Sequence, residues 1–250
     1  MSEESVTVYP SPEALAEAVA AELLIALTEA QAAGAVPAIV LTGGSVADGI
    51  HRAVAASPGR DGVDWSSVQV WWGDERFVRL DDGDRNERQA RTALLDGLPL
   101  HPAHVHPMPA DDGSQSAEQA AARYADELAA AAGNGSPVFD VLMLGVGEDG
   151  HVASLFPDHP GLAASGVAVA VRDSPKPPPV RVSLTFEALN RAREVWFVAA
   201  GGGKAWAVAQ ARAGGNVSEI PARAVRGIER TRWLLDEAAA AQLTAHPTGG

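Results

Sequence analysis

The chain has 250 residues, of which 46% are hydrophobic, with no cysteine and a formal net charge of -13 at pH 7. This length and apolar content suit one compact domain over residues 1–250, and the lack of cysteine excludes disulfides, thiolate metal sites and a cysteine nucleophile. The acidic balance argues against nucleic-acid binding. The polar start MSEESVTVYP argues against a signal peptide, and the lack of about eighteen consecutive uncharged apolar residues argues against a membrane span. We therefore expect a soluble cytoplasmic protein.

The first predicted element is a helix that begins after Ser11 and runs to about Ala33. Ser11 suits an N-cap, Pro12 suits the first turn, and Gly34 ends the helix. Apolar runs predict strands at AIVLT, VQVWW, DVLML, VAVAV, RVSLT, EVWFVAA and RWLL. Further helices are predicted over residues 46–56, 86–95, 116–132 and 204–212, and in the alanine-rich segment after RWLL.

Strands that are continuous apolar runs and alternate with helices indicate an α/β fold, with a mostly parallel sheet covered by helices on both faces. The run SPKPPP, residues 174–179, is interpreted as a rigid surface connection, and residues 246–250 as a disordered tail. Ligands in such sheets bind where the strands end. The loops TGGS, GDER, GVGEDGH and AGGGK occupy those positions and hold nearly all the unusual chemistry of the chain.

The TGGS loop lies between a predicted strand and a predicted helix. The amides of Gly43 and Gly44 and the hydroxyl of Ser45 could therefore bind an anion at the positive end of the helix dipole, although a tight turn without a ligand is the alternative. Against the acidic background, Arg76, Arg181 and Lys204 are candidates for a local positive site. Arg76 could instead form a local ion pair with its neighbour, and Lys204 could be a solvated lysine at a helix start.

The GVGEDG segment has the G-x-G-x-x-G spacing of a dinucleotide-binding turn. Asp173 stands where a ribose-binding acid could lie, which favours that interpretation. Glu148 and Asp149 would repel a pyrophosphate, however, and Pro157 interrupts the helix that such a turn requires. The spacing is therefore a weak match to a dinucleotide site.

His151 follows this loop at a strand end and is the best candidate for a catalytic base, because an imidazole can take up and return a proton near neutral pH. A structural histidine is the alternative. Asp74 occupies a similar strand end in WWGDER. The histidines of HPAHVHP lack the i, i+4 spacing of a zinc pair and favour a surface turn.

The ordered set LTGGS, WWGDERFV with DRNERQA, LGVGEDGHVASLFPDHP, RVSLTFEALNRAREVWFVAAGGGK and RWLLDEAA resembles the 6-phosphogluconolactonases over about Val36 to Ala240. The resemblance implies an α/β fold shared with glucosamine-6-phosphate deaminase and ribose-5-phosphate isomerase. It implies hydrolysis of 6-phospho-D-glucono-1,5-lactone to 6-phosphogluconate, the second step of the oxidative pentose phosphate pathway. Because a lactone is an activated ester, no covalent nucleophile or metal is required if water is positioned and deprotonated, and we expect no cofactor.

By the same resemblance, His151 is the general base, with Asp149 and Asp74 nearby. The ligand contacts carried over are Gly43, Gly44, Ser45, Arg76, Arg181 and Lys204. Two alternatives stay open. The first is a glucosamine-6-phosphate deaminase, which usually continues from the histidine into a run with a glutamate, whereas ASLFP here has no acid before Asp158. The second is a sugar-phosphate sensor, which usually carries a basic DNA-binding segment that the first 35 residues do not offer.

Overall fold

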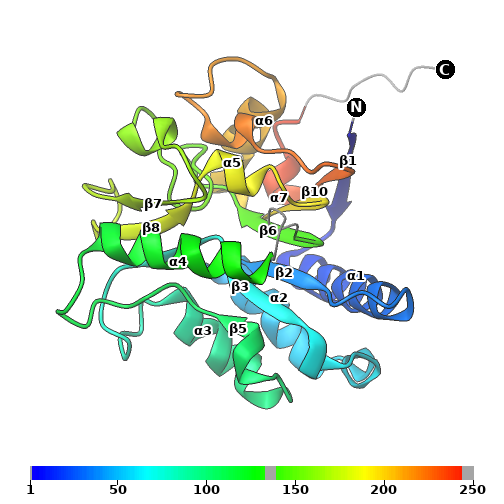
Figure 1. The fold of residues 1–250 in the computed structure, drawn as a ribbon. Helices are drawn as coiled ribbons and strands as arrows, with labels where there is room; N and C mark the ends of the chain where they lie inside the picture. The colour runs from blue at the N-terminus through cyan, green and yellow to red at the C-terminus, as the bar shows by residue number, and fades with distance from the viewer. Residues whose placement is uncertain (1, 133–138, 244–250) are drawn as a thin grey trace.

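A seven-stranded parallel sheet forms the centre of the molecule in a computed structural model that describes residues 2–132 and 139–243 (Figure 1). Its strand order is β1-β10-β9-β6-β2-β3-β5, and neighbouring strands run parallel. The strands are β1 (Glu3–Tyr9), β2 (Ala38–Leu41), β3 (Gln69–Trp72), β5 (Val105–His106), β6 (Val141–Gly145), β9 (Glu194–Ala199) and β10 (Arg230–Asp236). The tail predicted at 246–250 lies outside the described residues.

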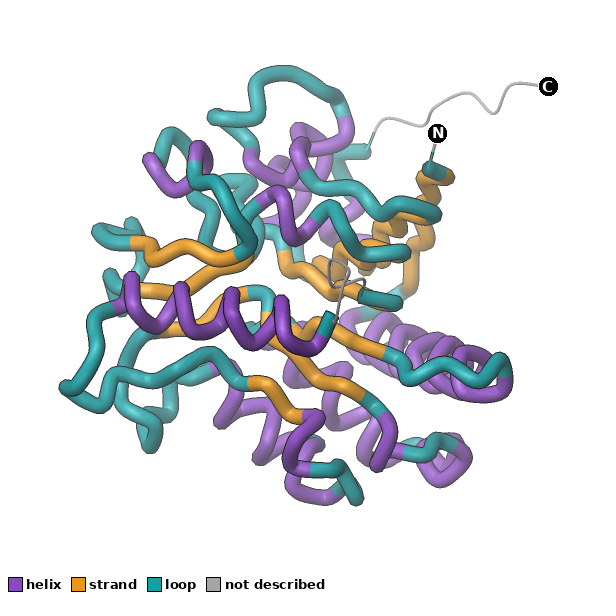
Figure 2. Tube along the Cα trace, in the orientation of Figure 1, coloured by secondary structure: helices purple, strands orange, loops and turns teal. Residues whose placement is uncertain are grey.

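Helices cover both faces of this sheet (Figure 2). They are α1 (Pro12–Ala32), α2 (Ser45–Ala56), α3 (Asn86–Ala93), α4 (Ala117–Ala131), α5 (Phe186–Leu189), α6 (Ala205–Arg212) and α7 (Glu237–Ala240). Successive strand residues point to opposite faces, so Trp71 belongs to the core cluster that includes α4 and α6, while Trp72 belongs to the cluster that includes α1 and α2. Trp71, Trp72 and Trp196 are fully buried, as expected of core residues. No described helix is long and apolar enough to cross a bilayer.

The predicted α/β architecture is confirmed, and local signals account for its first helix. The Ser11 hydroxyl accepts a hydrogen bond from the amide of Ala14 at 3.2 Å, and Gly34 takes a φ of +80° beyond the helix end. We did not predict β1. Its residues are half exposed at the sheet edge, so EESVTVY lacks the apolar run that identified the inner strands.

Two predicted strands, VAVAV and RVSLT, do not join the parallel sheet. They form β7 (Ala168–Val171) and β8 (Arg181–Leu184) in a separate three-stranded sheet, where β8 lies in the middle and pairs antiparallel with β7 and with β4 (Asp74–Arg76). The segment between β7 and β8 contains no helix. Parallel neighbours need a crossover of about a dozen residues or more, whereas a short connection suits an antiparallel pair.

The α4 helix is tied to the end of β3 by a single buried hydroxyl. Tyr124 donates to the carbonyl of Trp72 and accepts from its amide, both at 3.0 Å. The neighbouring strand β5 pairs only with Val70 and Trp71, so the outer backbone groups of Trp72 need another partner. The Tyr124 hydroxyl thus fixes the strand end from which Asp74 follows.

A buried carboxylate joins β4 to the start of α3. Glu75 accepts hydrogen bonds from the amides of Arg76, Asn86 and Glu87 at 2.7–2.9 Å, and its carboxylate lies 3.8 Å from the guanidinium of Arg85. Arg85 makes no side-chain cap at this helix start, so Glu75 satisfies the amides from a distant strand. Burial raises the pKa of Glu75 to about 7, against the opposing effects of Arg85 and the amides.

Replacing Arg85 with methionine should destabilise the fold by about 3–5 kcal/mol at alkaline pH, because Glu75 would stay buried without its cation. The pKa of Glu75 is about 7 in the folded protein and 4.5 in the unfolded chain. Protonation of Glu75 therefore stabilises the fold fully below pH 4.5, and this stabilisation is lost as the pH rises through about 7. The destabilisation should therefore shrink under acidic conditions. Urea unfolding of both proteins on either side of this window measures it.

The exposed Arg79, which pairs with Asp81 at 3.2 Å, offers the matched control. Arg79→Met should change the free energy of unfolding by about 0.5 kcal/mol or less at either pH. An Arg85→Met variant that loses the same stability in acid and in alkali would show that Glu75 is not the group left uncompensated.

Candidate active site

A cavity of about 280 Å³ lies where β2, β6 and β9 end, beside β4 and β8. The sequence had singled out residues on five separate segments, and most of them meet here. The predicted residues that line the cavity are Gly43, Gly44, Asp74, Arg76, His151, Arg181 and Lys204. Asp149 contacts His151 at its edge.

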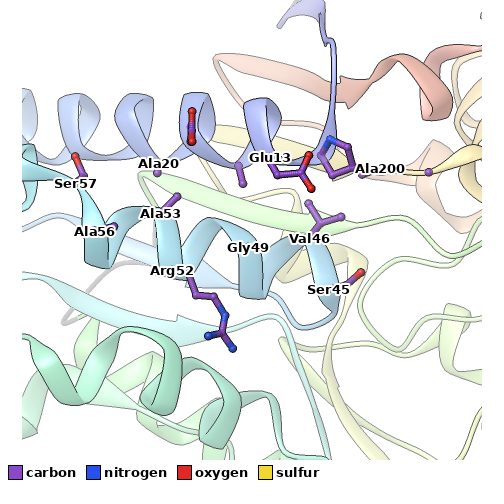
Figure 3. A pocket seen from close by; sticks show the side chains of 14 residues that line it. Glu13, Ala20, Ser45, Val46, Gly49, Arg52, Ala53, Ala56, Ser57 and Ala200 are labelled. Atoms are coloured by element: carbon purple, nitrogen blue, oxygen red, sulfur yellow. The ribbon is translucent and has the colours of Figure 1, made fainter.

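A larger groove, of about 710 Å³, runs between α1 and α2 (Figure 3). Small residues such as Ala20, Gly49 and Ala53 form much of its wall, and its charged groups are dispersed along the helices. It therefore lacks the converging polar groups that orient a polar ligand. The predicted contact Ser45 lines this groove rather than the smaller cavity, so a role for its hydroxyl stays a prediction.

His151 and Asp149 form a close pair beside the cavity. The Nδ1 atom of His151 lies 2.5 Å from Oδ1 of Asp149, which also accepts the amide of His151 at 3.3 Å. A side chain at Gly147 could not fit, because its Cβ would come within 1.9 Å of Nδ1 and 2.4 Å of Oδ1. Gly147 thus provides the space in which this pair forms.

Asp149 remains an anion in this arrangement. Partial burial acts to raise the pKa of its carboxyl, but the hydrogen bonds and charge of His151, with a smaller effect of Lys176, hold the pKa below its usual range. An ionised carboxylate only accepts hydrogen bonds, so Nδ1 carries the proton. In the neutral imidazole, the lone pair is then on Nε2 of His151.

The dinucleotide interpretation of GVGEDG does not match the structure around it. No helix follows the loop: Val152 and Leu155 form an isolated bridge, and the next helical turn begins at Pro160. Gly150 has a φ of +83° and packs against Ile220, where a Cβ would lie within 2.9 Å of the side chain. The glycines therefore serve a tight turn rather than close approach to a pyrophosphate.

The TGGS loop leads into α2 with its first amides uncapped. Gly44 occupies the N-cap position with a φ of +97°, and no side chain bonds to the helix start. Gly43 lies directly against Asn86, whose Oδ1 would be 1.9 Å from any Cβ there. The close approach brings the helix end to the cavity wall, where its amides can meet an anion.

Asp74 bonds to two side chains, neither of which is His151. Its carboxylate accepts from Ser154 Oγ at 2.6 Å and from Asn86 Nδ2 at 3.5 Å, and the same Nδ2 donates to the Asp74 carbonyl at 2.9 Å. Asn86 also accepts from Arg76 at 2.9 Å. The sequence analysis treated Asn86 only as a helical residue, and no local signal in the chain distinguishes it.

The cationic residues differ in what they contact. The Arg76 guanidinium donates to Asn86 and to the carbonyl of Asp84, and its buried Nε has no partner among the described residues. Burial, followed by the charge of Lys176, lowers the pKa of Lys204. Lys176 also lines the cavity, so SPKPPP is not simply a surface connection. A compositional signal could have identified it, because the chain has just one other lysine.

The histidines of HPAHVHP take separate partners. His104 Nδ1 lies 2.8 Å from the carbonyl of Ser66, while His106 stacks on Trp71 and places Nδ1 2.6 Å from Glu127. Within residues 2–132 and 139–243, no cluster of three or more histidine, aspartate or glutamate side chains could hold a metal ion.

Comparison with known proteins agrees with this fold. The family described as glucosamine-6-phosphate isomerases/6-phosphogluconolactonase matches residues 10–233. The 6-phosphogluconolactonase of Streptomyces coelicolor is 51% identical over 243 residues, which cover 94% of this chain and 93% of the relative. The crystal structure of 6-phosphogluconolactonase from Thermotoga maritima is 25% identical with a TM-score of 0.81, covering 94% of this chain and 100% of its own.

The predicted likeness to the deaminase fold is also confirmed. A monomeric glucosamine-6-phosphate deaminase, 16% identical, superimposes with a TM-score of 0.79 over 95% of this chain and 99% of its own. At that identity the likeness concerns the fold alone. The match over most of the sequence shows that this chain belongs to the family of glucosamine-6-phosphate isomerases and 6-phosphogluconolactonases.

Proposed function

We propose that this chain is an enzyme that hydrolyses 6-phospho-D-glucono-1,5-lactone to 6-phosphogluconate in the oxidative pentose phosphate pathway. The observation that carries the proposal is the Asp149 and His151 pair, with its 2.5 Å contact, at a cavity that is also lined by cationic side chains. The curated relatives named 6-phosphogluconolactonase support the same reaction. We propose further that one α/β domain performs it in the cytoplasm, without nucleic acid as a ligand.

In the proposed mechanism, His151 acts as a general base toward water. Its Nε2 accepts a proton as the water oxygen bonds to the lactone carbonyl carbon, which becomes tetrahedral. Asp149 then faces an imidazolium, which it stabilises through Nδ1. When the bond between the carbonyl carbon and the ring oxygen breaks, Nε2 returns the proton to that oxygen. A lactone is already an activated ester, so this scheme needs neither a covalent nucleophile nor a metal.

The remaining cavity residues bind and orient the substrate in this proposal. Gly43 and Gly44 present the start of α2, and Arg76, Arg181 and Lys204 supply positive charge. Because the phosphate is remote from the reacting carbon, its binding contributes orientation rather than bond making. Asp74 organises the wall through Ser154 and Asn86 instead of taking a proton.

Replacing His151 with alanine should lower kcat/KM about a hundred- to ten-thousandfold, the usual contribution of acid and base catalysis. The protein should stay folded and should still bind 6-phosphogluconate, because the ring lies at the cavity rather than in the core. Acid release from fresh lactone, corrected for spontaneous hydrolysis, measures the rate. His101→Ala at an exposed position is the control, and near-normal turnover by His151→Ala would contradict the assignment.

Replacing Asp149 with asparagine should lower kcat about ten- to a hundredfold, because the imidazolium loses a charged hydrogen-bond partner worth roughly 1.5–3 kcal/mol. KM should change little. Asp158→Asn is the control, since Asp158 is exposed and its positive φ is one that asparagine tolerates. In the wild type, the depressed pKa keeps Asp149 ionised, so the acid limb of kcat/KM for gluconolactone, which has no phosphate to titrate, should follow one ionisation, proton uptake by the imidazole. Two ionisations in that limb would contradict the pairing.

A substrate panel tests the reaction class in one plate. Purified protein is incubated with fresh 6-phosphogluconolactone, glucosamine-6-phosphate, or NAD and NADP, while acid release, ammonia release and cofactor binding are measured. We expect acid release alone, in proportion to enzyme and unchanged after dialysis against a chelator. Ammonia would favour deamination, cofactor binding would restore the dinucleotide hypothesis, and binding of sugar phosphates without turnover would favour a sensor.

A further inference from the structure

Both lysines of this chain line the same cavity. The sequence contains Lys176 and Lys204, and its other basic residues, apart from histidine, are all arginines. Lys176 lies in the SPKPPP loop and Lys204 follows β9, so distant segments bring the pair together. An ammonium is a compact charge with three donors on a flexible stem, unlike the planar guanidinium. Both lysine side chains of the sequence are therefore found at this one cavity.

The loop that carries Lys176 is held by Arg181. The Arg181 Nη2 donates to the carbonyls of Lys176 and Pro177 at 3.1 Å, and Nε donates to that of Pro178 at 3.2 Å. Prolines have no amide hydrogen, so this segment has few donors of its own. Ser174 Oγ supplies another, at 2.9 Å from the Lys176 carbonyl. Several donors of the guanidinium are therefore committed to the loop rather than to a ligand.

The Arg181 side chain is itself restrained by burial and by the ring of Phe156. It is 5% exposed, lies on β8, and sits 5.6 Å above the ring of Phe156. The Phe156 ring also packs against the ring of His151 at a centroid distance of 4.6 Å. A buried guanidinium between a rigid aromatic ring and a set of carbonyls has little freedom to follow a ligand. Its position suits support of the Lys176 loop.

The two ammonium groups are close enough to act on one another, without a carboxylate bonded to either. Lys176 lowers the pKa of Lys204, after the larger effect of burial, while Glu148 and Asp149 act in the opposite direction. Among the described residues neither lysine forms a salt bridge, although arginines elsewhere form many. Two like charges in one cavity repel each other, and a dianion placed between them would relieve that repulsion.

We propose that Lys176 and Lys204 together bind the phosphate dianion of the substrate, and that Arg181 is a positioning residue that holds the Lys176 loop over the cavity. The identity of the substrate rests on the proposed function, whereas phosphate binding by the lysine pair does not. The proposal adds Lys176 to the site and gives Arg181 a role other than direct contact.

The scarcity of lysine allows a direct spectroscopic test on the intact protein. Reductive methylation with isotopically labelled formaldehyde keeps the charge and should give signals from Lys176, Lys204 and the amino terminus only. Lys176→Met and Lys204→Met assign them. Inorganic phosphate and 6-phosphogluconate should each shift both lysine signals and raise both pKa values, whereas gluconate, which lacks the phosphate, should not. A Lys176 signal that phosphate leaves unmoved overturns the proposal.

Kinetics and binding of the unmodified protein test the two roles separately. Lys176→Met should raise KM for the phosphorylated lactone roughly ten- to a hundredfold, the worth of a hydrogen bond to a charged group, with little change in kcat. Turnover of gluconolactone without phosphate should not change. If Arg181 acts through the loop, adding Arg181→Met to Lys176→Met should weaken 6-phosphogluconate binding no further; additive losses would mean that Arg181 contacts the phosphate itself.

Circular dichroism of each variant shows whether it is folded, and Arg181→Lys provides a milder substitution if Arg181→Met does not fold. The outcomes also distinguish a failure of the lysine-pair proposal from a failure of the proposed reaction. If phosphate shifts both lysine signals and the lactone is not hydrolysed, the phosphate site stands and the proposed reaction is wrong. If the lactone is hydrolysed and the Lys176 signal does not respond, the reaction stands and the paired lysines are wrong.

Discussion

The parallel direction of the central strands is the constraint on which the site depends. Because β2, β6 and β9 run the same way, their carboxyl ends lie at one edge and the loops after them meet. The antiparallel sheet of β4, β8 and β7 then adds Asp74, Arg76 and Arg181 beside that edge. The loops of the parallel sheet supply the proton-transfer pair and Lys204, and the antiparallel sheet supplies Arg76 and Arg181, so the complete cavity forms only where the two sheets meet.

Glycines at these strand ends are needed for space as much as for backbone conformation. A Cβ at Gly43 would lie 1.9 Å from Asn86, one at Gly147 would lie 1.9 Å from His151, and one at Gly203 would lie 2.7 Å from Glu148. In each case a polar side chain occupies the volume that another residue would fill. Within G-x-G-x-x-G, Gly147 leaves space for His151 and Asp149, while Gly150 forms a positive-φ turn against Ile220, so the spacing resembles a nucleotide motif without the helix that motif requires.

The sequence predicted what short-range patterns determine. The cap at Ser11, the apolar inner strands and the loops at their ends were all identified, and with them most of the cavity. The rest depends on contacts between distant segments. Lys176 enters the cavity because Arg181 captures the carbonyls of its loop, and Asn86 does so because it bonds to Asp74 and Arg76. The half-exposed β1 has no apolar run to identify it, and the apolar run of β7 does not specify which strand it pairs with.

The charge of the whole molecule sets how the cavity can recognise an anion. A net charge of -13 repels an anionic sugar phosphate at long range, so attraction has to come from groups that contact it. Such contacts are available where Lys176 and Lys204 project into a small cavity beside the amides of α2, and salt screens partly buried interactions less than exposed ones. Binding through direct contacts also requires fixed geometry. The buried Arg181 and Glu75 provide it through hydrogen bonds to the backbone of Lys176 and Asn86, which line the cavity. An acidic surface and a cationic cavity are thus compatible, because one governs approach and the other governs the bound state.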